Sequence, residues 1–304
     1  MLLQQLINGL SIGAIYALIA VGYTMVYGVL RLINFAHWDV YMVGAMTGWY
    51  SARRWYGIGE PSWGAFALVL LTSMLVCGAL GFLIELLAYR PLRNQPRLTA
   101  LITAIGVSML LSFGGQWFFG PNPQAFPDLV PGLRENPDLA RVGGVVVGRV
   151  DAIIVALTLG LMLLLRYVVL HTRTGLALRA VSFRFDTAAL MGVNINRIVS
   201  VTFVIGSMLA AVAGVLVALR SPSVHPLMGL TVGLKAFVAA VLGGIGNITG
   251  AVAGGLLLGM VETLVVGYFP RGSQYQAGVA FVILILVLLV KPSGILGRET
   301  VEKV

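Results

Sequence analysis

Charged residues are scarce in this chain, and that scarcity decides its class. Of 304 residues, 10% are charged and 59% are hydrophobic, and the mean hydropathy is +0.95. A soluble domain of this length needs far more charge to cover its surface. The composition therefore indicates an all-α polytopic integral membrane protein, in which apolar helices cross the bilayer.

Cysteine, histidine and catalytic motifs are also missing or rare. The single cysteine, Cys77, lies in an apolar run and has no partner for an internal disulfide. The three histidines, His37, His171 and His225, are scattered along the chain. The P-loop motif, HExxH, CxxC and GxSxG do not occur. These absences predict a protein that is not an enzyme, with no catalytic residues, no metal, no cofactor and no P-loop ATP hydrolysis.

Acidic residues are outnumbered, and the excess of positive charge needs a physical reason. The chain has 20 Lys and Arg against 11 Asp and Glu, a formal net charge of +9. Cytoplasmic loops of membrane proteins retain basic residues, and anionic lipid head groups attract them. We therefore expect membrane lipid, and no nucleic acid, as the partner of these charges. The clearest basic interruption in the second half is 171–197, which we interpret as a cytoplasmic loop.

Apolar runs predict eight to ten transmembrane helices in a single domain, residues 1–304. We expect spans at about 5–30, 31–50, 63–89, 98–119, 150–170, 198–219, 227–242, from the glycines at 243–246 to about 267, and at 277–290. Arginines in 90–97 indicate a cytoplasmic loop, and the polar segment 120–149 suits an external one. Counting crossings from these loops places the C-terminus in the cytoplasm. Nine crossings leave the N-terminus outside, and a re-entrant 31–50 would reverse it.

Two interruptions of the apolar sequence are candidates for a translocation path. Asn34, His37 and Asp39 fall within 31–45, and polar groups at membrane depth are costly unless they face protein or water. This stretch is either a broken helix or re-entrant turn, or an ordinary cytoplasmic loop. The second interruption is a glycine break at Gly243, Gly244 and Gly246.

Three ionisable residues stand near or inside apolar spans. Glu85 and Glu262 are candidates for a proton or ion pathway. Glu85 lies within about one turn of Arg90, so a structural pair or an interfacial position is the alternative. Lys235 could extend to the interface, pair with an acid on another helix, or face the pathway.

Several ordered segments resemble one transporter family. They are QQLINGLSIGAIYALIAVGYTMVYG, LINFAHxDVYMVG, ExxAYRPLR, GVNINRIVSVTFVIGSMLAAVAGVL, LKAFVAAVLGGIGNITGAVAGGLLLGMVE and the tail PSGILGRETVEKV. Read together, they resemble the permease subunits of branched-chain amino-acid ABC importers, most closely the LivH type. The resemblance covers nearly the whole length.

The resemblance implies a multi-pass permease of the bacterial inner membrane. It would work with a LivM-like second permease or a second copy of itself, two ABC ATPase subunits and a periplasmic substrate-binding protein. The implied cargo is branched-chain, hydrophobic amino acids; related permeases move urea, short amides or aromatic acids. The competing class is an ion-coupled secondary transporter with Glu85, Glu262 or Asp39 as the coupling acid.

The family places its ATPase coupling region between the fifth and sixth spans, here 171–197. We expect one coupling helix over Thr174–Gly192, with one face formed by Leu178, Val181, Phe185, Ala188 and Ala189. Arg179 and Asp186 should lie together beside that face. The residues expected to couple to the ATPase are Thr174, Gly175, Arg179, Asp186, Ala188, Ala189 and Gly192. The alternative is an amphipathic helix resting on the bilayer. The middle departs from the family, with Gly175-Leu176-Ala177 where Gly-Arg-Ala is usual.

Overall fold

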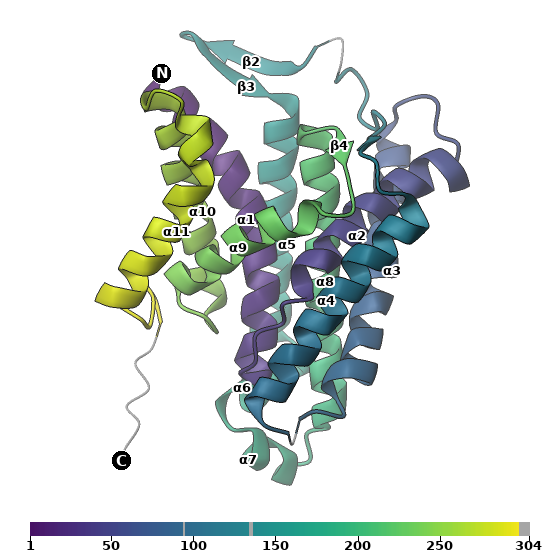
Figure 1. The fold of residues 1–304 in the computed structure, drawn as a ribbon, viewed down its shortest axis with the longest axis vertical. Helices are drawn as coiled ribbons and strands as arrows, with labels where there is room; N and C mark the ends of the chain where they lie inside the picture. Colours follow the sequence, from purple (N-terminus) through teal and green to yellow (C-terminus); the bar gives the residue numbers. More distant parts are fainter. Residues whose placement is uncertain (94, 134–135, 298–304) are drawn as a thin grey trace.

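The computed structural model describes residues 1–93, 95–133 and 136–297, and helices dominate this part of the chain (Figure 1). Seven of the described helices are long and apolar enough to cross a membrane. They are α1 (Leu2–Leu30), α3 (Trp63–Ile84), α4 (Arg97–Phe119), α5 (Arg149–His171), α8 (Ile195–Arg220), α10 (Ile248–Tyr268) and α11 (Gly272–Val290). A π-helical turn, η2 (Glu85–Tyr89), prolongs α3. The all-α polytopic class is confirmed.

Two further helices are not among these seven. They are α2 (His37–Tyr50), which continues into the π-helical turn η1 (Ser51–Trp55), and α9 (Met228–Gly243). With 16 residues and a rise of 1.5 Å per residue, α9 is about 24 Å long, against about 30 Å of hydrocarbon. The extension of α2 through η1 adds two arginines, Arg53 and Arg54. Together the long and short helices account for the expected spans. The chain leaves α1 at Leu30 and starts a buried α2 at His37, which supports the broken-helix alternative.

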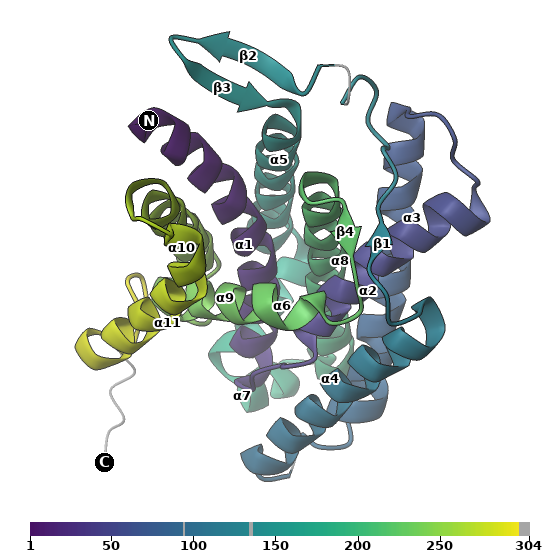
Figure 2. The same cartoon turned by 45° about the horizontal axis from the view of Figure 1, so that its top comes forward.

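The remaining elements lie at the two ends of the helix bundle. Two small helices, α6 (Arg173–Phe183) and α7 (Phe185–Leu190), connect α5 to α8. At the opposite end, β2 (Asp138–Val142) and β3 (Val145–Gly148) form an antiparallel hairpin beside the N-terminus (Figures 1 and 2). The Gln4 side chain binds Val146 there, donating to its carbonyl at 2.9 Å and accepting from its N–H at 2.7 Å. The 120–149 loop and the N-terminus therefore share one side.

A second pair of strands fixes the entry to α9. β1 (Gln124–Ala125) pairs antiparallel with β4 (Ser223–Val224), and Gln124 faces Val224 in the register. The segment 221–226, SPSVHP, thus carries a strand that ties the start of α9 to the 120–149 loop.

The centre of the bundle is α1, of whose apolar window 89% is buried, whereas α11 at the edge has 6%. Glycines let α1 and α10 touch backbone to backbone. A Cβ added at Gly13 would lie 2.8 Å from the Cα of Leu256, and one at Gly259 would lie 2.4 Å from the Cα of Gly13. Gly255 meets Ala17 in the same way, at 2.6 Å from its nitrogen. The small-residue stripe in α1 is therefore a helix–helix contact.

Candidate functional site

The corner between α5 and α6 is rigid because of two residues. The Thr172 hydroxyl accepts from the Gly175 N–H at 3.1 Å and donates to the Val168 carbonyl at 2.6 Å. A Cβ on Gly175 would lie 2.2 Å from that carbonyl oxygen and 2.4 Å from the Val169 oxygen. Only glycine permits this approach. Thr172, which the sequence interpretation missed, is the N-cap of α6, whereas the expected Thr174 is exposed.

The prediction of one continuous helix over Thr174–Gly192 is wrong. Arg184 has extended backbone angles, φ −146° and ψ 110°, and separates α6 from α7. The break changes the helical phase, so Phe185 and Ala189 are exposed although Leu178, Val181 and Ala188 are buried as expected. The sequence has no proline or glycine at this break. It arises because α6 and α7 bury their apolar residues in different directions.

The break also separates Arg179 from Asp186, which were expected to lie together. Arg179 donates a long hydrogen bond to the Leu170 carbonyl, 3.4 Å away, so its side chain turns back toward α5. Asp186 instead lines a pocket below α1. Gly192, with φ +83°, then turns the chain from α7 toward α8.

Helix α6 is fastened to the end of α1. The Ser182 hydroxyl donates to the Gly28 carbonyl at 2.7 Å, and Val181, one residue earlier, is 2% exposed. Since α1 ends at Leu30, this bond joins the α5–α8 connector to the last turn before the polar break at 31–36. Ser182 was not among the residues expected from the sequence, and no local pattern singles it out.

Three large apolar side chains of this connector are exposed. Leu190 and Met191 are 88% and 80% exposed, and Phe183 is 77% exposed. Large apolar side chains gathered on one exposed segment mark an interaction surface more often than a solvated one. The connector is thus held from behind by Thr172, Gly175 and Ser182 and presents apolar side chains outward.

Glu85 lies in a network of structural bonds next to this connector. Its carboxylate is fully buried and pairs with Arg90 at 2.8 Å and with Arg93. Ser200 on α8 donates to it at 2.7 Å, and Arg93 also reaches Asn196 at 2.6 Å. The hydrogen bond to Glu85 raises the pKa of Arg90. These contacts support the structural-pair alternative for Glu85.

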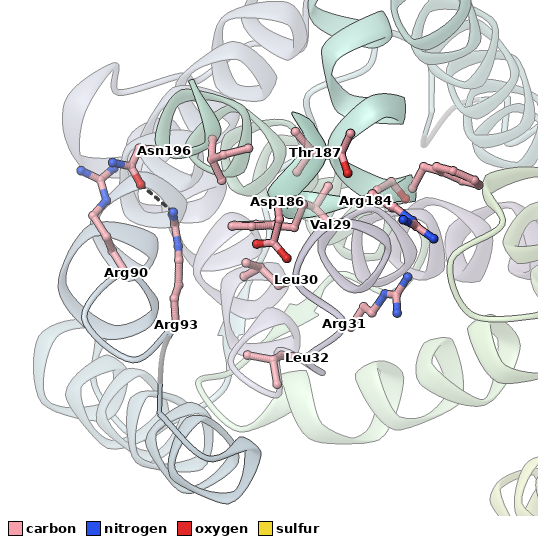
Figure 3. A pocket seen from close by; sticks show the side chains of 15 residues that line it. Val29, Leu30, Arg31, Leu32, Arg90, Arg93, Arg184, Asp186, Thr187 and Asn196 are labelled. Carbon is pink, nitrogen blue, oxygen red and sulfur yellow. Dashed lines mark hydrogen bonds between the residues drawn. The ribbon is translucent and has the colours of Figure 1, made fainter. Parts of the chain in front are cut away.

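A pocket of about 1080 Å³ lies between the end of α1, the segment after η2, the α6–α7 junction and the start of α8. Arg31, Arg90, Arg93 and Arg184 line it, and Asp186 is the acid among the lining residues. Figure 3 shows Arg90 and Arg93 on one side and Arg31 and Arg184 on the other. The pocket is therefore cationic and borders the connector directly.

The polar residues of the first break, Asn34, His37 and Asp39, are buried. Asn34 accepts hydrogen bonds from the Tyr89 hydroxyl at 2.9 Å and the Ala36 N–H at 3.1 Å. The His37 ring packs edge-on against Tyr23, with 4.7 Å between centroids, and Gly22 leaves it room. These bonds hold the start of α2 in the bundle between α1 and η2.

Asp39 is bound from α4. Ser108 and Ser112, one turn apart, both donate to its carboxylate, the second at 2.6 Å. Trp38 donates to the Ser108 oxygen at 2.8 Å. The spacing of the two serines, four residues apart on α4, was the available sign of this contact. Their bonds attach α2 to α4, a helix with little of its apolar window buried, 22%.

The glycines of the second break pack the end of α9, and Gly246 lies beside Tyr27 near the end of α1. A Cβ on Gly243 would lie 2.0 Å from the Gly250 oxygen, and Gly244 and Gly246 have φ of +103° and +96°. Leu296 donates to the Gly243 carbonyl at 3.1 Å. The break therefore joins α9, α10 and the segment after α11. The end of the resembling tail, 298–304, lies outside the described residues.

Lys235 and Glu262 are partners across two helices. The Lys235 ammonium lies 3.1 Å from Glu262, whose carboxylate is fully buried. Tyr16 on α1 donates to the same carboxylate at 2.9 Å and Gln276 on α11 at 3.0 Å. Of the three alternatives for Lys235, this geometry supports pairing with an acid on another helix.

These features define the class of the protein. Seven membrane-length helices enclose two short ones, and buried ionisable groups pair with each other. At one end a fixed helical connector exposes apolar side chains. The chain is a multi-pass helical membrane protein.

Comparison with known proteins gives the family. The family model described as branched-chain amino acid transport system / permease component matches residues 5–288, so the chain belongs to this family of transport permeases. The high-affinity branched-chain amino acid transport system permease protein BraD of Pseudomonas aeruginosa is 44% identical over 303 residues, covering 99% of this chain and 98% of the relative. LivH of Escherichia coli K12 is 43% identical over 309 residues, covering 99% and 97%. The ribose import permease RbsC of the same strain is 32% identical over 130 residues, 41% and 40% of the two chains. The resemblance stated from the sequence is confirmed.

Proposed function

We propose that this chain is the transmembrane permease subunit of an ABC importer for branched-chain, hydrophobic amino acids. The names of relatives that match almost the whole chain at 43–44% identity support the cargo and the machine. The chain would act as one permease domain in the bacterial inner membrane, without catalysing a reaction itself. Its partners would be a LivM-like permease or a second copy, two ABC ATPase subunits and a periplasmic substrate-binding protein.

The observation that carries this proposal is the exposed apolar surface of the α5–α8 connector. Phe183, Leu190 and Met191 project from a segment that is rigidly held behind. An ATPase that covers these side chains removes them from water, and this burial stabilises its contact with the bundle. The other residues assigned to this coupling site are Thr174, Gly175, Arg179, Asp186, Ala188, Ala189 and Gly192. Gly175 and Ala188 support the surface from inside, since both are buried.

ATP-driven closure of the ATPases would move the connector, and the connector would move the bundle. The Thr172 cap and Gly175 transmit the motion to α5, and the Ser182–Gly28 bond transmits it to α1. Alternating access then requires two arrangements of the helices, biased by ATP and by the loaded binding protein.

For the translocation path we retain the two breaks. Asn34, His37 and Asp39 would hold the first break open at membrane depth, and the backbone at Gly243, Gly244 and Gly246 would form the second. A zwitterionic amino acid can use freed backbone groups and helix ends in such breaks. The structural bonds of Asn34 and Asp39 suit a supporting role, in which selectivity rests mainly with the binding protein.

Substitution of the exposed surface tests the coupling site. Leu190→Asp and Met191→Asp should leave the permease folded, because both side chains are exposed, yet abolish copurification of the ATPases and ATP-dependent uptake in proteoliposomes supplied with binding protein. Leu139→Asp, at a 59% exposed position on β2, is the matched control for ATPase retention. Normal ATPase retention and transport in the α7 variants would rule the site out.

The same proteoliposomes separate the proposed importer from an ion-coupled carrier. Uptake should need ATP, the ATPases and the binding protein, and a proton or sodium gradient applied to this chain alone should drive none. Glu85 and Glu262 are held in structural pairs, which supports the ATP-driven alternative. Competition by urea, short amides and aromatic acids against labelled leucine tests the cargo.

A further inference from the structure

The pocket beneath the connector holds two arginines whose side chains have no partner among the residues that the structure describes. Arg90 and Arg93 share the buried carboxylate of Glu85. Arg31 and Arg184 also line the pocket, and neither has a side-chain hydrogen bond or ion pair among the described residues. Figure 3 shows both on the same side of the pocket, Arg31 from the end of α1 and Arg184 from the α6–α7 break. Two cations side by side repel each other unless an anion lies with them.

The backbone of Arg31 gives a second, independent sign. It has φ +53° and ψ +29°, the left-handed conformation at the C-terminal end of a helix, and its N–H donates to the Tyr27 carbonyl at 2.7 Å. Glycine normally fills this position because a Cβ is unfavourable there. An arginine at this position therefore carries a backbone cost that glycine would not. Among the described residues, the one other non-glycine with positive φ is Arg271, before α11.

We propose that a carboxylate side chain of the ATPase subunit enters this pocket and pairs with Arg31 and Arg184. The inference rests on the coupling site proposed above. It adds a charged contact to the apolar contact of Leu190 and Met191. The two contacts are neighbours, because Phe183 and Phe185, which flank Arg184, also line the pocket. Docking would therefore place the ATPase over the pocket mouth and desolvate both guanidinium groups.

A carboxylate fits the charges better than a phosphate does. Asp186 lines the same pocket and has no side-chain partner among the described residues, so a doubly charged phosphate would face its repulsion. One acidic side chain leaves Asp186 free to share the guanidinium groups. The pocket also opens beside the connector, which makes it continuous with the surface assigned to the ATPase.

A paired contact of this kind would make the end of α1 part of the ATPase interface. The ATPase would then bind two points at once. One is the connector, through Arg184, and the other is the first residue after α1, Arg31. The distance between these two points would be fixed while the carboxylate is bound and would be free to change when the carboxylate leaves. The Ser182–Gly28 bond joins the same two elements from within the permease.

The test uses the complete importer in detergent and in proteoliposomes. Arg31→Gly removes the charge and places at this positive φ the residue that adopts it without strain. Loss of function in this variant therefore cannot be assigned to misfolding. We expect ATPase affinity to fall on the order of ten-fold or more for Arg31→Gly and for Arg184→Gln, with a weaker salt dependence of binding. Arg31→Lys should retain most of the affinity. Arg271→Gly, the same change at the other positive φ, should leave ATPase affinity unchanged.

Charge reversal identifies the partner. Arg184→Glu should be rescued by an acid-to-lysine change in the ATPase, found by replacing its acidic residues one at a time. If the Arg31→Gly and Arg184→Gln permeases bind the ATPase with the same affinity as the Arg271→Gly permease, the inference is wrong. The coupling site is tested separately by the Leu190→Asp and Met191→Asp variants. If these variants lose copurified phosphatidylglycerol with ATPase affinity intact, the pocket binds lipid and the inference is wrong as well.

Discussion

The pair formed by Lys235 and Glu262 should be worth several kcal/mol, and a double-mutant cycle can measure it. The Glu262 carboxylate is fully buried and the Lys235 side chain is 12% exposed. Removal of one member of a buried pair costs about 3–5 kcal/mol, because the other charge stays buried without compensation. Replacement of both by neutral side chains of similar volume is close to neutral.

We therefore expect Lys235→Met alone to be the more damaging change. It leaves a fully buried carboxylate with two neutral donors, Tyr16 and Gln276. Glu262→Gln keeps an oxygen that can accept from Tyr16, and the partly exposed lysine can shift toward water. The double variant should recover most of the lost stability, with a coupling energy of about 3 kcal/mol or more.

Thermal unfolding of the detergent-purified permease, followed by loss of the monodisperse peak, is the assay. At about 2–4 °C per kcal/mol for large domains, Lys235→Met should lower the midpoint by roughly 6–20 °C. The double variant should lie within a few degrees of the wild type. If both single variants unfold at the wild-type midpoint, or the double variant falls by the sum of the two, the pair does not hold α9 to α10.

Two smaller changes test the packing around the coupling path. Gly13→Ala inserts a Cβ 2.8 Å from the Cα of Leu256, so α1 and α10 must separate, and we expect the permease to lose roughly 1–3 kcal/mol of stability. Gly160→Ala is the control, because the space around Gly160 is open, and it should not destabilise the permease. Equal unfolding midpoints for the two variants would contradict the α1–α10 contact. Thr172→Ala removes the α6 cap and should cost about 1 kcal/mol, whereas Thr174→Ala, at an exposed position, should stay within about 0.5 kcal/mol. Measurement of the same midpoints checks both, and a larger effect at Thr174 would mean that the cap is assigned to the wrong threonine.

Helix positions follow from the sequence because hydrophobic length is a local property. The run expected at 63–89 is α3 with η2, ending at Tyr89, and the run expected at 150–170 is α5, Arg149–His171. Both runs end where arginines, glycines or prolines end the apolar composition. The same reasoning finds α2 and α9 but does not show that they are short helices inside the bundle. Their depth depends on partners such as Ser108, Ser112 and β1, which lie far away in the sequence.

The break at Arg184 shows where local reasoning ends. A helical wheel assumes one continuous phase, and nothing in SFRFDTAA interrupts it. The structure turns there because Leu178 and Val181 are buried on one helix and Ala188 on another, a choice made by tertiary packing. Pairing of Lys235 with Glu262 is of the same kind: the sequence supplied both charges and three alternatives, and the crossing of α9 and α10 selects one.

The contacts around α1 make it the element through which the proposed coupling site can act on the proposed path. Ser182 binds its last turn, and Arg31 follows that turn directly. Gly13 interlocks its middle with α10, and α10 carries the Glu262 that holds α9. A displacement of α6 must therefore either break the Ser182–Gly28 bond or move the end of α1. If α1 moves as a rigid body, α10 and α9 move with it, because backbone contact at the glycines leaves no space for sliding. Both breaks, one after α1 and one after α9, then change together, although they lie in different halves of the chain.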